Sequence, residues 1–293
     1  MQTFDIVVIG SGPAGEGAAM MATKNHRRVA LVERYEEVGG GCTHWGTIPS
    51  KALRQAVKTL NDLRHNPLLR DFQSENPPQY PQILANADKV VDAQVASRRR
   101  FYERNLVPLF EGAARFKDAH HVEILQRGAV VQTLKAEHFV IATGSRPYHP
   151  PEVDFTHPRI KDSDSILRQQ QHPFSVTIYG AGIIGCEYAS IFLNLGAKVT
   201  LVNTQDRLLS FLDDEIAEAL SYHLREQGCI IRHEEQHERV EPRERDVVLH
   251  LKSGRRIKSD VLLWANGRSG NSDGMGLEAL GIALNSRGQI QVD

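Results

Sequence analysis

The sequence predicts an α/β fold built from two parallel central sheets and one antiparallel flap. A β-branched run at residues 4–9 ends in a glycine-rich loop, and a helical pattern and a second apolar run follow it. The same order returns from residue 175 onward. Between the two copies lie several short β-type segments, which are typical of antiparallel hairpins. The repeat indicates that two copies of one βαβ unit organise the chain.

The first half of the chain alternates between strand and helix patterns. Residues 4–9 and 29–32 have the composition of buried strands, and residues 13–24 between them carry small residues at helical spacing. Helical spacing of apolar residues also predicts helices over 45–64 and 82–105. The flap and its returning strand are predicted in the segments 107–110, 121–125, 129–134 and 138–142.

The second half repeats this arrangement after a proline-rich stretch. Prolines and polar residues over 145–157 mark a crossing between domains, so we predict domains at 1–150 and 151–293. Strands are predicted at 175–179 and 198–202, with a helix at 183–195 between them, and an amphipathic helix is predicted at 213–227. Further strands are expected near Ile230, 247–251 and 261–263.

Composition and charge limit the function classes. The 293 residues are 41% hydrophobic and 24% charged, which is typical of a globular protein of about two domains. The formal net charge is −1 with both signs dispersed, so we expect small molecules or proteins as partners and neither nucleic acid nor acidic membrane. Three cysteines are too few for a secreted disulfide framework, which favours the cytoplasm. No apolar run reaches the roughly 18 residues of a membrane span.

Three other features receive structural interpretations. The arginines at 98–100 beside Phe101 and Tyr102 could suggest nucleic-acid binding, but a solvated helix face is expected because Glu103 follows them. Cys186 and Cys229 are expected to be buried thiols. The histidines lack ligand spacing with cysteines or carboxylates, so no metal site is predicted.

The first glycine loop, residues 10–15, has the spacing of a dinucleotide-binding turn. Gly10, Gly12 and Gly15 permit a tight turn, a close approach of backbone N–H groups to a pyrophosphate, and tight packing of helix on strand. Glu33 ends the second predicted strand, where a carboxylate accepts hydrogen bonds from an adenosine ribose. The alternative is that the glycines only pack a helix, but the ordered strand, loop, helix, strand and acid favour nucleotide binding.

The second glycine loop, residues 180–185, repeats this pattern and predicts a second Rossmann-like domain. Gly180, Gly182 and Gly185 match the first three glycines, but Asn203 stands where an acid is expected. Without a carboxylate, nothing repels a 2′-phosphate, and Arg207 could supply positive charge, so use of both NAD and NADP is predicted. Alternatively, Asn203 binds the ribose of NAD alone and Arg207 is a solvated surface residue.

Between the loops, the segment GGGCTHWGTIPSK at 39–51 resembles the flavoprotein disulfide reductase family, whose members carry a CxxxxC pair before an IPSKAL-type helix. The resemblance extends over almost the whole chain, including the segments 142–144 and 265–268. It implies FAD at the first loop and a nicotinamide cofactor at the second. The sequence departs from the family at one position, because Cys42 matches the first redox cysteine but Thr47 stands in place of the second.

The resemblance also implies roles for individual residues. Lys51 and Glu187 match an ion pair beside the flavin N5, where a cation can stabilise charge on the reduced ring. Other positions match cofactor-binding residues of the family. Along the FAD ribose and pyrophosphate these are Glu33, Arg34, Gly39, Gly40, Gly41 and Cys42. Ala113 matches a residue near the adenine, Thr143 and Gly144 match residues over the cofactor, and Gly267 and Arg268 match residues on the nicotinamide side. The bland alternative for Lys51 and Glu187 is a helix-surface lysine and a helix-interior glutamate.

These features together predict an enzyme that transfers hydride between NADPH and NAD through FAD. A hydroxyl at position 47 cannot form a disulfide, so electrons from the flavin need another acceptor, of which a second nicotinamide nucleotide is the simplest. The segments CTHWGT, DFTHPRI and DRLL resemble those of the soluble pyridine nucleotide transhydrogenases within the family. Alternatives are a disulfide reductase-like or diaphorase activity with another acceptor, or an inactive nucleotide-binding fragment. The chain resembles about the first two thirds of such enzymes, so we expect an incomplete FAD domain without the dimerisation domain; homo-oligomers are expected of the complete protein.

Overall fold

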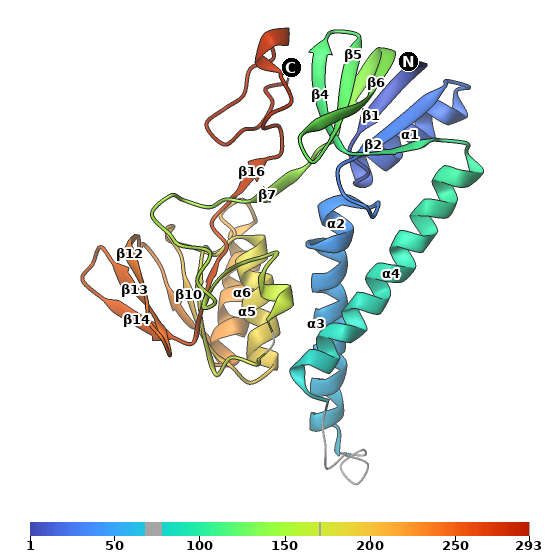
Figure 1. Cartoon of the computed structure of the whole chain (residues 1–293). Coiled ribbons are helices and arrows are strands. Elements are labelled where there is room, and N and C mark those ends of the chain that lie inside the picture. Colours follow the sequence, from blue (N-terminus) through green and yellow to red (C-terminus); the bar gives the residue numbers. More distant parts are fainter. Residues whose placement is uncertain (68–77, 170, 293) are drawn as a thin grey trace. The chain divides into compact units, whose positions relative to one another are not determined.

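The computed structural model describes residues 1–67, 78–169 and 171–292, and it divides the chain into two compact units (Figure 1). The first unit contains Met1–Ile48, Lys89–Arg146 and Arg268–Asp293, and the second contains Pro49–Asp88 and Pro147–Gly267. The predicted boundary near residue 150 coincides with only one of the crossings between the units.

The division differs from the two predicted continuous domains because distant segments supply core residues to each unit. Leu53 and Val57 pack in a core cluster of the second unit. Met275 and Leu277 pack in a core cluster of the first unit. Apolar burial therefore places Pro49–Asp88 in the second unit and Arg268–Asp293 in the first, whereas the prediction had placed them the other way round.

The first unit is built on a six-stranded sheet with the order β3-β2-β1-β6-β5-β4. Strands β1, β2, β3 and β6 run parallel, and β4, β5 and β6 form the predicted antiparallel flap. The strands are β1 (Gln2–Ile9), β2 (Val29–Glu33), β3 (Leu109–Glu111), β4 (Ala113–Asp118), β5 (His121–Gln126) and β6 (Ala129–Ile141). The flap and the returning strand share β6, which is one continuous strand where two segments were predicted.

Helices cover one face of this sheet. Helix α1 (Pro13–Lys24) joins β1 to β2, the short α2 (Gly40–His44) follows β2, and α4 (Tyr80–Arg104) ends in this unit. Val8, Ala19, Leu31 and Tyr102 belong to one core cluster between helices and sheet. Arg98 pairs with Glu16 at 3.0 Å and its side chain is only 14% exposed, so the expected solvated face is wrong at this position.

The second unit has a fully parallel five-stranded sheet with the order β11-β10-β9-β15-β8. Its strands are β8 (Ile160–Asp162), β9 (Ser175–Tyr179), β10 (Lys198–Val202), β11 (Ile230–Arg232) and β15 (Val261–Trp264). The helices α3 (Thr47–His65), α5 (Ile183–Asn194) and α6 (Asp214–Glu226) supply the residues that cover one face. The parallel sheets in both units confirm the predicted α/β fold with Rossmann-like domains.

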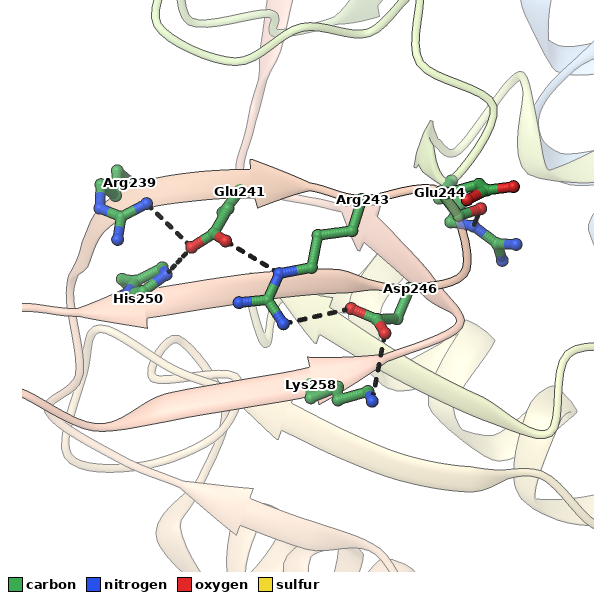
Figure 2. A network of polar contacts seen from close by, with 8 residues as sticks. Arg239, Glu241, Arg243, Glu244, Asp246, His250 and Lys258 are labelled. Atoms are coloured by element: carbon green, nitrogen blue, oxygen red, sulfur yellow. Dashed lines mark hydrogen bonds and ion pairs between the residues drawn. The ribbon is translucent and has the colours of Figure 1, made fainter.

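A three-stranded antiparallel sheet covers the other face of the second sheet. It consists of β12 (His237–Pro242), β13 (Val247–Leu251) and β14 (Arg256–Ser259). Glu241 on β12 contacts Arg243 at 2.8 Å, His250 of the central strand β13 at 2.7 Å, and Arg239 at 3.1 Å (Figure 2). These contacts, with Arg243 first, lower the pKa of Glu241 to about 2.

A two-stranded ribbon of β7 (Ser145–Pro147) and β16 (Arg268–Gly270) lies where the chain passes between the units. Within the described residues, no helix has both the length and the apolar character needed to cross a membrane. Cys186 and Cys229 are buried, as predicted. Burial raises the pKa of the Cys186 thiol to about 12 and that of the Cys229 thiol to about 11.

Candidate dinucleotide-binding sites

The first glycine loop connects β1 to α1 in a conformation that only glycine can adopt. Gly10 has φ +105°, and a Cβ at this position would lie 2.3 Å from the carbonyl oxygen of Ala142. A Cβ on Gly15 would lie 1.8 Å from the carbonyl oxygen of Gly10. Both contacts are far inside van der Waals distance, so side chains here would force the strand, the loop and the helix apart.

The N-terminus of α1 leaves its backbone N–H groups without a side-chain cap. Gly12 is the N-cap residue and accepts the first helical hydrogen bond, but no side chain bonds the first turn. Gly40 approaches Gly12 so closely that a Cβ on Gly40 would lie 2.8 Å from the Cα atom of Gly12. Uncapped N–H groups at a helix N-terminus, bordered by glycines, are suited to a phosphate group.

Glu33 lies at the end of β2, beside this loop, and is 7% exposed. Its carboxylate accepts hydrogen bonds from the Ser11 backbone N–H at 2.9 Å, the Ser11 hydroxyl at 2.5 Å and the Tyr35 N–H at 3.1 Å. A carboxylate has about four acceptor positions, so roughly one is left for a ribose hydroxyl. The guanidinium of the neighbouring Arg34 donates to the Tyr35 hydroxyl at 2.8 Å.

Residues 39–47 continue the edge of the same site. Gly39 has φ +120° and donates its N–H to the Ser11 hydroxyl at 2.8 Å. Gly41 and Cys42 lie in α2, and Cys42 is a half-buried free thiol. Thr47 begins α3 and is exposed, so a hydroxyl occupies the position of the second family cysteine.

The other strand ends of the first sheet meet at this edge. The N–H of Gly112, which precedes Ala113, donates to the Glu33 carbonyl at 2.8 Å. After β6, Asn271 holds the chain by donating to the Thr143 carbonyl through Nδ2 and to the Gly144 carbonyl through its N–H, each at 3.1 Å. The predicted positions at Ala113, Thr143 and Gly144 therefore lie at the carboxyl edge that carries the first loop.

The second glycine loop repeats this geometry in the second unit. A Cβ on Gly185 would lie 1.8 Å from the Gly180 carbonyl oxygen, and one on Gly180 would lie 2.7 Å from the Ala265 backbone. Gly182 caps α5 without a side-chain hydrogen bond and has no atom near its Cβ position. Gly267 follows β15 at the same sheet edge with φ +98°.

Asn203 occupies the position that corresponds to Glu33. The N–H of Gly10 donates to the Val32 carbonyl at 2.8 Å, and the N–H of Gly180 donates to the Val202 carbonyl at 2.9 Å, so the next residue is Glu33 in one unit and Asn203 in the other. Asn203 is 5% exposed. Arg207 pairs with Asp214 and donates to the Ser210 carbonyl at 3.1 Å, and its side chain is 41% exposed.

Lys51 and Glu187 form the predicted ion pair within the second unit. Lys51 Nζ lies 2.6 Å from Glu187 Oε1, and the buried Ser50 hydroxyl lies 3.4 Å from the same oxygen. Both charged residues line a cavity of about 510 Å³ formed with residues of α3, α5 and α6. Among the described residues, no group of three or more His, Cys, Asp or Glu side chains could hold a metal ion.

The family of the chain follows from its comparison with known proteins. The sequence model of the pyridine nucleotide-disulphide oxidoreductase family matches residues 4–293. The chain belongs to this family. A curated soluble pyridine nucleotide transhydrogenase from Pseudomonas aeruginosa is 54% identical over 290 residues, which are 99% of this chain and 62% of that protein. The chain thus spans less than two thirds of the length of this relative.

Two solved structures have the same fold as this chain. The Cu(II) complex of the HOCl-induced flavoprotein disulfide reductase RclA from Escherichia coli has a TM-score of 0.87 at 28% identity, covering all of this chain and 63% of that one. LpdA from Mycobacterium tuberculosis has a TM-score of 0.90 at 24% identity, covering all of this chain and 64% of that one, and supports the fold alone.

Two residues that brace the first glycine loop and the segment after β6 were not predicted from the sequence. Ser11 lies inside the first loop, where its hydroxyl links Glu33 to Gly39, and its place between two glycines was the available signal. Asn271 braces the segment after β6 from far along the chain, and no local pattern predicts such a contact.

Proposed function

We propose that this chain carries the dinucleotide sites of an FAD-dependent oxidoreductase that transfers hydride between NADPH and NAD. Relatives at 54% identity bear the name soluble pyridine nucleotide transhydrogenase. The observation that carries the proposal is the threonine at position 47. The segment between the two complete glycine loops has one thiol, Cys42, and Thr47 stands in place of its partner cysteine. Because threonine cannot join a disulfide relay, electrons must leave through a bound nucleotide or another small acceptor.

The residues of the first unit fit FAD. The uncapped start of α1 and the adjoining Gly12 and Gly40 suit its pyrophosphate, and the remaining acceptor position of Glu33 suits its adenosine ribose. By the family pattern, Ala113 lies near the adenine, and Thr143 and Gly144 close over the cofactor. When bound, the flavin supplies reversible acceptance and donation of hydride.

The second glycine loop is proposed to bind the nicotinamide nucleotides in turn. The start of α5 has no acidic residue in its first turn and no side-chain cap at Gly182, which suits a pyrophosphate. Asn203 is uncharged, so neither a 2′-hydroxyl nor a 2′-phosphate meets a carboxylate there. By the family pattern, Lys51 supplies a cation to the flavin ring, Glu187 orients its ammonium group, and Gly267 lines the nicotinamide side.

The proposal is tested with protein loaded with FAD. NADPH should reduce a spectrally distinct NAD analogue, and G185A should abolish this reaction because its Cβ would strike the Gly180 carbonyl. G17A is the matched control, since a Cβ at Gly17 meets no atom within 4 Å. If NADPH bleaches the flavin but the analogue stays oxidised, hydride transfer between nucleotides is refuted.

A second candidate is a diaphorase or disulfide reductase-like activity, which the free Cys42 thiol and the likeness to a flavoprotein disulfide reductase favour. It predicts faster oxidation of NADPH with a quinone or a disulfide than with the NAD analogue. The third candidate, a nucleotide-binding fragment without turnover, predicts a purified chain without the flavin absorption band.

Partners and location are proposed on the same basis. The expected partners are NAD, NADP and FAD, and the complete protein is expected to form homo-oligomers, as the family resemblance implies. Three cysteines without a disulfide among them fit a reducing cytoplasm. Gel filtration of the complete protein with and without FAD tests the oligomer.

A further inference from the structure

The chain after β10 is fixed at both backbone groups of Asn203. The N–H of Asn203 donates to the Arg232 carbonyl at 2.8 Å, and its carbonyl accepts from the Glu235 N–H at 3.0 Å. Asn203 is also 5% exposed. These two hydrogen bonds hold the backbone of Asn203, so the orientation of its side-chain amide decides whether a donor or an acceptor faces a ligand.

Three neighbours select that orientation. Nδ2 of Asn203 donates to the Arg207 carbonyl at 2.7 Å and lies 3.3 Å from Nδ1 of His233, while Oδ1 accepts from the Gln205 N–H at 3.3 Å. A reversed amide would bring Oδ1 against the Arg207 carbonyl and Nδ2 against the Gln205 N–H. With the His233 proton on Nε2, Nδ1 accepts from Nδ2, and both N–H groups of Nδ2 are used. In this tautomer only Oδ1 has capacity left, so Asn203 can accept a further hydrogen bond but cannot donate one.

Arg207 connects this amide to the start of α6. Its guanidinium donates to the Ser210 carbonyl at 3.1 Å and pairs with Asp214 in the first turn of α6. Asp213 caps the same helix by accepting from the Glu215 N–H at 3.0 Å. The guanidinium therefore ties the backbone of residue 207 to a capped helix, and the carbonyl of residue 207 holds the Asn203 amide.

We infer that Arg207 is a positioning residue that acts through Asn203 and favours NAD over NADP, rather than a ligand of the 2′-phosphate. The inference rests on the proposed binding of both nucleotides at the second glycine loop. A ribose 2′-hydroxyl can donate to Oδ1, whereas an ionised phosphate offers only acceptors. Loss of the tether frees the residue 207 carbonyl, lets the amide turn, and makes its N–H groups available to the phosphate.

The decisive experiment is calorimetric titration of the 293-residue chain and its R207A variant with NAD and with NADP. We expect R207A to lower the affinity for NAD about three- to tenfold, as loss of one hydrogen bond would, and to leave the affinity for NADP unchanged or higher. D214A should shift the preference in the same direction, and it provides the same test if R207A does not fold. R225A is the matched control, because Arg225 lies in the last turn of α6, at the opposite end from Asp214, and contacts Ser221 of the same helix.

A direct phosphate ligand would give the opposite sign. If R207A lowered the affinity for NADP about tenfold or more and left the affinity for NAD unchanged, the inference would be overturned. An unchanged preference in both R207A and D214A would overturn it as well.

Action through Asn203 is tested by a double-mutant cycle. In an N203A background, R207A should change the NAD to NADP preference by less than about 1.5-fold, because the amide that it positions is gone. A threefold shift that persists there would overturn the inference. If the unsubstituted chain binds neither nucleotide, both the inference and the proposed function fail. If it binds both and R207A selectively loses affinity for NADP, only the positioning role is refuted.

Discussion

Replacement of Glu33 by glutamine should destabilise the first unit. The Glu33 carboxylate is buried and accepts three hydrogen bonds, two from Ser11 and one from the Tyr35 N–H. Glutamine has nearly the same size, but one of its terminal atoms is an NH2 donor. When its oxygen faces Ser11, the donor faces the Tyr35 N–H, and that N–H loses its acceptor.

The magnitude follows from the change in these bonds. A hydrogen bond to a charged group contributes about 1.5–3 kcal/mol, and a neutral one contributes about 0.5–1.5 kcal/mol. E33Q converts the two Ser11 bonds from charged to neutral and removes the third. Removal of the charge also relieves the cost of its burial, which offsets part of the loss. We therefore expect the free energy of unfolding to fall by about 2 kcal/mol.

Urea denaturation at neutral pH measures this change. The protein has two tryptophans, Trp45 in the first unit and Trp264 in the second, so fluorescence in a W264F background follows the first unit. The control is E37Q, since Glu37 forms a half-exposed pair with Arg99 that contributes about 0–1 kcal/mol. A loss of less than about 0.5 kcal/mol in E33Q, or an equal loss in E37Q, would refute the reasoning.

Three other predictions follow from single contacts. G15A should abolish FAD binding because its Cβ would lie 1.8 Å from the Gly10 carbonyl oxygen, whereas G17A on the same helix should retain binding. Flavin absorbance after gel filtration compares the two variants. Equal retention of FAD would contradict the packing argument. Glu241 has its pKa lowered from 4.5 to about 2, chiefly by Arg243, so it stabilises the fold above pH 4.5 and loses this effect as the pH falls towards 2. Denaturation of E241Q should therefore depend less on pH in this window, and an identical slope would contradict the assignment. Iodoacetamide at pH 8 should label Cys42 before the other two thiols, whose pKa values burial raises to about 12 and about 11; simultaneous labelling by mass spectrometry would contradict this.

The two βαβ units could be predicted from the sequence because their determinants are local. Apolar alternation, glycine spacing and small residues at helical positions lie within short windows around residues 10 and 180. The division into units could not be predicted, since it depends on where Leu53 and Met275 find apolar partners far along the chain. Arg98 was predicted to face solvent for the same reason, because its partner Glu16 lies on another helix.

The candidate sites divide in the same way. The glycines were found by spacing, and the Lys51–Glu187 pair was found through the family pattern and forms in the structure. Arg207 was assigned by its charge and its distance from Asn203 along the chain. Charge alone does not reveal that Asp214 and the Ser210 carbonyl already engage its guanidinium. The positioning role proposed for Arg207 rests on these two contacts and not on its charge.

The differences between the two glycine loops involve pairs of residues. In the first loop, Ser11 donates to the Glu33 carboxylate, and the corresponding residues in the second loop are Ala181 and Asn203. A buried carboxylate without the serine hydroxyl would lack a donor, and a serine hydroxyl without the carboxylate would lack its acceptor, so the two positions are coupled chemically. Together the changes remove one negative charge from the ribose edge of the second loop while its backbone hydrogen bonds stay the same. Under the proposed function, the first loop would retain one cofactor with a free 2′-hydroxyl, and the second would admit nucleotides with or without a 2′-phosphate.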